Sequence, residues 1–131
     1  MTRTAHILVV DDNLDAREAL RKLLEGAGHT VTCIVNGAEA LRWLGKGSRP
    51  DVILMDLWMP VVDGWKFRQR LWQNPELEQI PVVLISGEGD LAQIAASLDV
   101  DAYFRKPVNS KELLQAIGAL GGGEACGYFT E

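Results

Sequence analysis

The chain has 131 residues, of which 47% are apolar and 24% charged, and it carries a formal net charge of −5 at pH 7. This length fits one domain with an ordinary hydrophobic core, and the acidic balance lacks the basic stripe of nucleic-acid-binding domains, so we expect no direct nucleic-acid contact. Cys33 and Cys126 have neither zinc-ligand nor disulfide-framework spacing, and the N-terminus resembles neither a signal peptide nor a membrane span, which favours a cytoplasmic protein without membrane attachment.

The first half of the chain alternates between strand and helix patterns. A continuous apolar run at 7–10 predicts a central strand, and leucines at helical spacing then follow Asn13, a suitable N-cap. The run 30–35 partly alternates, which is typical of a strand at the edge of a sheet. Asn36 begins a capping-box pattern that predicts a short helix reaching Leu44.

The second half continues this alternation. Turn signals at Met59-Pro60 and Asp63-Gly64 separate a wholly apolar strand from the next helix, and Asn74-Pro75 ends that helix. The expected elements are a strand at 52–55, a helix at 65–73, a strand at 81–85, a weak helix at 91–98, a short strand at 102–104 and a helix from 109 to 120.

Five successive strand–helix units predict an α/β fold. Such alternation produces a parallel sheet with helices on both faces, here a doubly wound, flavodoxin-like three-layer sandwich. Because the first, third and fourth strands are continuous apolar runs, we expect them at the centre, which fits the strand order 2-1-3-4-5. The domain should cover residues 1–120, and 121–131 should form a flexible tail after a run of glycines.

Polar side chains follow several of these strands directly. Asp11 and Asp12 follow the first strand, Asp56 the third, Ser86 the fourth, and Lys106 comes shortly after the fifth. Ligand sites in open α/β sheets lie outside the carboxyl ends of the strands. We therefore expect these side chains to meet at one edge of the sheet.

This set of residues suits the capture of a phosphoryl group. Three converging carboxylates repel one another, so at least one pKa should rise unless a cation such as Mg²⁺ binds. A carboxylate can accept a phosphoryl group as an acyl phosphate. Lys106 would then supply a second positive charge, and Ser86 a hydrogen bond to a phosphate oxygen.

Four motifs in chain order carry a resemblance to a known family. They are Asp11-Asp12, Asp56 to Pro60 with Asp63-Gly64, Ser86-Gly87, and Tyr103 with Lys106-Pro107. Through these motifs, which belong to the region 7–120, the chain resembles the receiver domain of the two-component response-regulator family.

The resemblance implies a role for each matching residue. Asp56 would be the phosphoacceptor; Asp12 and Asp56 would bind Mg²⁺ directly together with the Trp58 backbone carbonyl; and Asp11 would act mostly through water. Lys106 and Ser86 would stabilise the phosphoryl group. The Lys106-Pro107 peptide bond should be cis. The domain would catalyse only its own phosphorylation and dephosphorylation, so it would not be an enzyme acting on separate substrates.

The resemblance also implies a switch. Phosphorylation adds about −1.5 to −2 charges, Ser86 moves toward the phosphate, and Tyr103 rotates inward. The face made by the helix at 91–98, the fifth strand and the last helix then engages a downstream partner or an output domain, or a second copy as a homodimer. The phosphodonor would be a sensor histidine kinase or a histidine phosphotransfer protein.

Two positions near the acceptor suggest control of the phosphorylated lifetime. Trp58 lies two residues after Asp56, and its bulk could shield an acyl phosphate from water. Glu88 lies two residues after Ser86 and could orient or repel an attacking water.

Simpler readings of the same residues remain open. Asp11-Asp12 can be an ordinary acidic helix start, Ser86 can cap a turn with Gly87, and Tyr103 can be a static edge residue. Two other classes of function compete with phosphoacceptance. A magnesium-dependent aspartyl phosphatase resembling the haloacid dehalogenases would need an aspartate at Trp58, and a degenerate receiver that only binds partners would not need the full acidic set.

Overall fold

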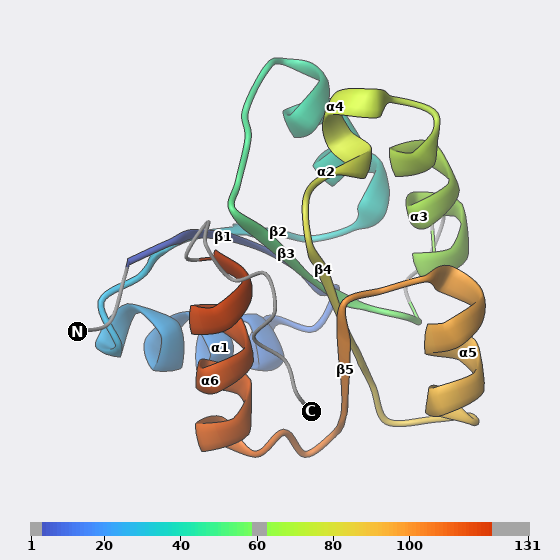
Figure 1. Ribbon diagram of the computed structural model, residues 1–131. Helices are drawn as coiled ribbons and strands as arrows, with labels where there is room; N and C mark the ends of the chain where they lie inside the picture. The colour runs from blue at the N-terminus through green and yellow to red at the C-terminus, as the bar shows by residue number, and fades with distance from the viewer. Residues whose placement is uncertain (1–3, 59–62, 122–131) are drawn as a thin grey trace.

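The computed structural model describes residues 4–58 and 63–121. The tail was expected over 121–131, and Gly121 is the last residue of the final helix. Residues 122–131, with Cys126, and the turn at Met59-Pro60 lie outside the described residues. Figure 1 shows a central sheet covered by helices on both faces. In chain order the elements are β1 (His6–Val10), α1 (Leu14–Gly26), β2 (Thr30–Ile34), α2 (Gly37–Gly45), β3 (Val52–Asp56), α3 (Gly64–Trp72), α4 (Pro75–Glu78), β4 (Val82–Ser86), α5 (Leu91–Leu98), β5 (Ala102–Arg105) and α6 (Ser110–Gly121).

The sheet has five parallel strands in the order β2-β1-β3-β4-β5. This confirms the predicted fold class and strand order. The prediction succeeded because β3 and β4 are buried along their whole length and β1 along most of it, whereas β2 and β5 each keep partly exposed positions. A strand buried on both faces reads as a nearly continuous apolar run, so its sequence indicates its central place.

One helix differs from the expected five-unit repeat. After α3, the four-residue helix α4 begins at Pro75, so two helices separate β3 from β4. Asn74 caps α4 by accepting a hydrogen bond from the Glu76 N–H at 2.9 Å. Asn74-Pro75 ends the preceding helix, as expected, but a proline at the first helical position is also a good start. We predicted the end of the preceding helix from this pair but not the start of α4.

The predicted N-caps form local hydrogen bonds. Asn13 accepts from the Ala16 N–H and Asn36 from the Glu39 N–H, both at 2.8 Å. The Glu39 carboxylate pairs with Arg42 at 2.6 Å. Asn36 therefore caps α2 as expected, while the carboxylate of the proposed capping box bonds within the helix.

The turn into α3 depends on a glycine. Asp63 caps the helix by accepting from the Lys66 N–H at 3.0 Å, and the Gly64 N–H donates to the Leu57 carbonyl at 3.0 Å. A side chain at Gly64 would lie only 3.0 to 3.2 Å from atoms of Leu57. The Asp63-Gly64 pair thus brings the start of α3 back against the residue that follows β3.

Each face of the sheet has its own hydrophobic core. Leu8 and Val10 of β1 join α2, α3, α4 and α5 on one face, while Ile7 and Val9 join α1 and α6 on the other. These strand residues are fully buried. Alternate residues of a strand point to opposite faces, so each central strand contributes to both cores. The two cores fix the positions at which the strands end.

Arg68 is a buried cation that the sequence did not predict. It is only 4% exposed, and its guanidinium donates to the Leu98 carbonyl at 2.9 Å and to the Asp99 carbonyl at 2.7 Å. It also lies 5.1 Å from the centre of the Trp72 ring. Asp99 has a φ of 52°, in the left-handed region, where the helix ends. Arg68 therefore ties α3 to the C-terminal end of α5.

His29 is buried just before β2, where its Nδ1 accepts a hydrogen bond from the Ala5 N–H at 3.0 Å. Burial lowers the pKa of His29 because the surrounding atoms disfavour the imidazolium. A protonated Nδ1 could no longer accept this hydrogen bond. The neutral form therefore stabilises the junction between the chain before β1 and β2.

We predict that His29 makes the stability of the fold sensitive to acid. Its contribution to the free energy of unfolding should be complete above its ordinary pKa of 6.5 and should fall at lower pH, because the unfolded chain then binds a proton more readily. Urea unfolding of the native chain and of His29→Gln should show a larger stability difference at pH 8 than at pH 5. A difference independent of pH would contradict this role.

Candidate functional site

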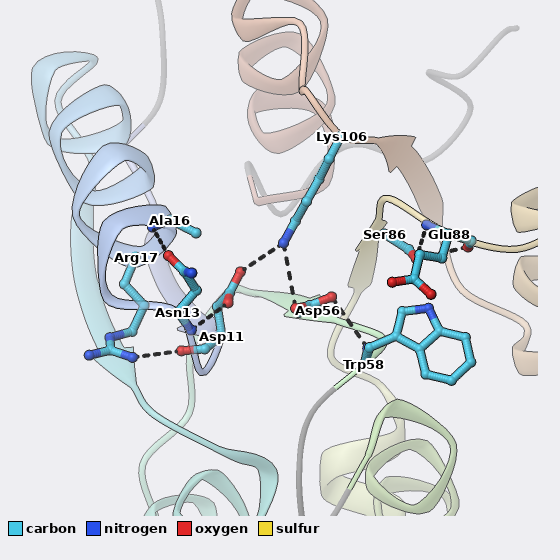
Figure 2. Close-up of polar contacts among 9 residues, drawn as sticks. All are labelled: Asp11, Asn13, Ala16, Arg17, Asp56, Trp58, Ser86, Glu88 and Lys106. Carbon is cyan, nitrogen blue, oxygen red and sulfur yellow. Dashed lines mark hydrogen bonds and ion pairs between the residues drawn. The ribbon is translucent and has the colours of Figure 1, made fainter.

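The carboxyl ends of the strands bring acidic and basic side chains together. Asp56 is the last residue of β3, Asp11 follows β1, and Lys106 follows β5. Val10 pairs with Met55, which places Asp11 and Asp56 next to each other. Figure 2 shows the Lys106 side chain extending between the two carboxylates.

The three predicted aspartates form one cluster. Asp11, Asp12 and Asp56 each offer a carboxylate oxygen, and these oxygens all lie within 4.8 Å of one another. Asp11 and Asp56 are buried, and Asp12 is exposed. Oxygen donors grouped this closely suit a hard divalent cation such as Mg²⁺, and the exposed Asp12 leaves one side open to solvent.

Lys106 provides a positive charge inside this cluster. Its Nζ lies 3.4 Å from Asp11 Oδ2 and 3.5 Å from Asp56 Oδ2. Both carboxylates are buried, whereas the lysine side chain is 34% exposed. Buried charges require such compensation, so Lys106 lowers the energy of keeping two carboxylates side by side.

Asp11 is held in place by its own helix start. Its Oδ1 accepts from the Asn13 N–H at 2.9 Å, and its carbonyl accepts from Arg17 at 2.9 Å. These contacts appear in Figure 2. The sequence argument missed Arg17, although the predicted cap at Asn13 places this residue in the first turns of the helix. Asp11 therefore bonds to the N-cap residue of α1 and also belongs to the acidic cluster.

The surroundings of Asp56 act in opposite directions on the pKa of its carboxyl group. Burial raises the pKa of Asp56, Lys106 lowers it, and the neighbouring Asp11 raises it further. The predicted rise in pKa is confirmed in direction. Its cause is corrected, because burial contributes more than the repulsion between carboxylates.

Trp58 follows Asp56 by two residues, and Figure 2 shows its indole extending toward the side of Glu88. Its backbone N–H donates to Asp56 Oδ1 at 3.3 Å, and its indole packs edge-on against Trp65, with ring centres 5.2 Å apart. The side chain is nevertheless 45% exposed. The contact with Trp65 limits the positions that the Trp58 indole can take.

Ser86 is buried at the end of β4, but its hydroxyl is engaged elsewhere. It donates to the Glu88 carbonyl at 3.0 Å and accepts from the Glu88 N–H at 3.1 Å. Both contacts are drawn in Figure 2. The turn-capping reading of Ser86 therefore describes this conformation, and a contact with Asp56 would require the hydroxyl to turn away from Glu88.

Tyr103 and the end of β5 complete the set of predicted residues. Tyr103 pairs with Leu84 across the sheet and is 47% exposed, so its ring lies outward in this conformation. The Lys106-Pro107 peptide bond is cis. Arg105, which precedes the lysine, donates to the Gly89 carbonyl at 2.6 Å. This bond connects β5 to the loop that carries Ser86 and Glu88.

Comparison with known families now gives this site a context. A family model described as the response regulator receiver domain matches residues 7–118. The chain belongs to this family. Receiver domains accept phosphoryl groups in two-component signalling, are not classical enzymes, and bind Mg²⁺ in the acidic pocket. They interact with histidine kinases and output domains.

Curated relatives come from bacteria and plants. The chain is 34% identical over 119 residues to the response regulator MprA of Mycobacterium ulcerans, covering 89% of this chain and 50% of that protein. It is 31% identical over 110 residues to the two-component response regulator ORR7 of Oryza sativa, covering 82% and 52%. The receiver thus spans about half the length of these curated relatives.

Two solved structures share the same fold over nearly their full length. A putative response regulator from Chloroflexus aurantiacus is 30% identical with a TM-score of 0.83, covering 92% of this chain and 99% of its own. The receiver domain of a signal transduction histidine kinase from Syntrophus aciditrophicus is 32% identical with a TM-score of 0.82, covering 97% and 98%. Within residues 4–58 and 63–121, no helix of this receiver is both long and apolar enough to cross a bilayer.

We predict that the receiver is more stable without the buried charge of Asp56. Because the folded-state pKa of Asp56 is raised, ionisation of this group disfavours folding at neutral pH, and stability returns as the pH falls through that pKa. Asp56→Asn should therefore have a higher free energy of unfolding than the native chain at pH 7 without divalent cations. The gain should shrink as the pH approaches 4. A loss of stability at pH 7 would contradict this account.

Proposed function

We propose that Asp56 is the phosphoacceptor of this receiver. The observation that carries the proposal is the position of its carboxylate, which ends β3 beside Asp11 and faces the ammonium of Lys106 at 3.5 Å. A carboxylate attacks phosphorus only when its negative charge and that of the phosphoryl oxygens are both compensated. Lys106, together with a divalent cation that the aspartates would hold, meets this requirement.

The aspartates are suited to hold Mg²⁺. We assign Asp12, Asp56 and the Trp58 carbonyl as its direct protein ligands, and Asp11 as a ligand acting through water. The donor set supports this assignment because it combines carboxylates within 4.8 Å with an exposed side for retained waters. When bound, the cation supplies charge neutralisation on the carboxylates and on the transferring phosphoryl oxygens.

The transfer itself is a displacement at phosphorus. An Asp56 oxygen attacks the phosphohistidine of a sensor kinase or a histidine phosphotransfer protein, the P–N bond breaks, and a P–O bond forms. The imidazole nitrogen leaves with the bonding electrons. Lys106, already near Asp56 Oδ2, is positioned to meet a phosphoryl oxygen, and Ser86 supplies a hydrogen bond after its hydroxyl leaves the Glu88 backbone.

The output follows from movement of the loop after β4. We infer that Ser86 moves toward the phosphate and that Tyr103 rotates inward, which changes the face formed by α5, β5 and α6. That face would engage a partner protein, an output domain or a second copy of the chain in the cytoplasm. The exposed ring of Tyr103 and the bond between Arg105 and Gly89 support a resting conformation with a distinct loop position.

We predict a single phosphate adduct that depends on Asp56. Intact mass should rise by one phosphoryl group after incubation with acetyl phosphate and Mg²⁺, and no adduct should form with Asp56→Asn or without Mg²⁺. Asp15→Asn is the matched control because Asp15 is exposed on α1, and it should phosphorylate normally. An adduct retained in Asp56→Asn would overturn the assignment.

We predict that Trp58 prolongs the phosphorylated state. Trp58→Ala should remove the indole that packs against Trp65, admit water to the acyl phosphate and raise the autodephosphorylation rate several-fold. Trp58→Phe, which keeps an aromatic ring, is the matched control and should stay close to the native rate. The rate is followed by loss of the phosphorylated mass after the donor is removed, and an unchanged or slower rate in Trp58→Ala would refute shielding.

A further inference from the structure

A groove lies at the β2 edge of the sheet, away from the face proposed for output. It has a volume of about 540 Å³ and runs between α1 and α2 past the end of β2. It is shallow and open to solvent, so it suits a segment lying along the surface better than an enclosed small molecule. We call it the β2-edge groove; the lining residues used below are Arg17, Cys33, Ile34, Val35, Arg42 and Lys46.

The groove wraps around an unpaired strand edge. Among the described residues β2 pairs with β1 alone, so its outer backbone edge has no neighbouring strand. Cys33 packs against the core on the α1 side, while Ile34 packs against the core on the α2 side. Successive groove residues thus straddle the edge of the sheet. An exposed sheet edge can accept an additional extended segment through main-chain hydrogen bonds.

The charge of the groove is opposite to that of the whole chain. Arg17, Arg42 and Lys46 line it together with a single acidic residue, Glu39, which is already paired with Arg42. The chain as a whole carries a net charge of −5. A local excess of positive charge on an acidic protein selects for an anionic occupant.

The shape and apolar surface of the groove favour a peptide. Val35 is 43% exposed at the end of β2, and Trp43, held edge-on against His6, contributes aromatic surface. Side chains of an extended segment alternate between two directions. A segment that alternates acidic and aliphatic residues can therefore present carboxylates to the basic side chains of the groove and apolar groups to Val35 and Trp43.

We propose that the β2-edge groove binds an extended acidic segment of a partner protein, which adds to the sheet beside β2. The opposite edge of the sheet is β5, so this contact leaves the α5–β5–α6 face free. Arg17 also donates to the Asp11 carbonyl at 2.9 Å, so the segment lies next to the acidic cluster without entering it. The inference does not depend on phosphorylation of Asp56.

The test uses a short labelled peptide of alternating glutamate and valine with the full native chain. Binding is measured by fluorescence anisotropy and mapped by amide chemical shifts, and a peptide with lysine in place of glutamate and one with a central proline are compared. Arg42→Gln combined with Lys46→Gln, the rim variant, removes two of the three basic side chains that line the groove. Lys22→Gln combined with Lys111→Gln is the matched control, because both lysines are exposed outside the groove.

The proposal expects a shift of the amides at 33–36, and binding weakened about tenfold or more by the rim variant and by the proline peptide but not by the control variant. The lysine peptide should not bind. Absence of binding at millimolar peptide would overturn the proposal. So would equal binding of the lysine peptide, shifts confined to other elements, a response reproduced by inorganic phosphate alone, or self-association through this edge in place of peptide binding.

Discussion

The site depends on the repulsion between two carboxylates at the carboxyl ends of β1 and β3. Asp11 and Asp56 are buried side by side, and Lys106 is the cation that contacts both. Burying two like charges costs free energy that a single partly exposed lysine compensates only in part. This leaves Asp56 with a raised pKa and the cluster with an affinity for further positive charge. The same burial brings together the oxygen donors that suit a divalent cation.

The remainder of the fold keeps these two carboxylates close together. Two hydrophobic cores, one on each face, fix where β1 and β3 end and so set the distance between the carboxylates. The helix start at Asn13 and the close contact of Gly64 with Leu57 position the segments that leave these strands. The loop after β4 has a different character, because Ser86 is held by the Glu88 backbone and Arg105 by the Gly89 carbonyl. A few local hydrogen bonds of this kind are readily exchanged, which suits a switch.

Short local patterns in the sequence predicted the strands and most site residues. Features that depend on tertiary contacts were missed. Apolar runs revealed the central strands, and residues directly after them revealed Asp11, Asp12, Asp56 and Lys106 as neighbours. Helix α4 was missed because Asn74-Pro75 was treated only as a stop. The turn at Ser86 was one of the alternatives that the local sequence left open. The burial of Arg68 was missed because it depends on where the end of α5 lies, which has no signature in local spacing.

The central claim is that the Asp56 carboxylate, Lys106 and the Ser86 hydroxyl form one phosphoryl site. The most direct measurement is a crystal structure of the chain with Mg²⁺ and beryllium fluoride, a mimic of a phosphoryl group. We expect beryllium on an Asp56 oxygen, Lys106 Nζ beside a fluoride, and the Ser86 hydroxyl turned from the Glu88 backbone toward another fluoride. Beryllium bound elsewhere, or a site in which Ser86 keeps its bonds to Glu88, would contradict this claim.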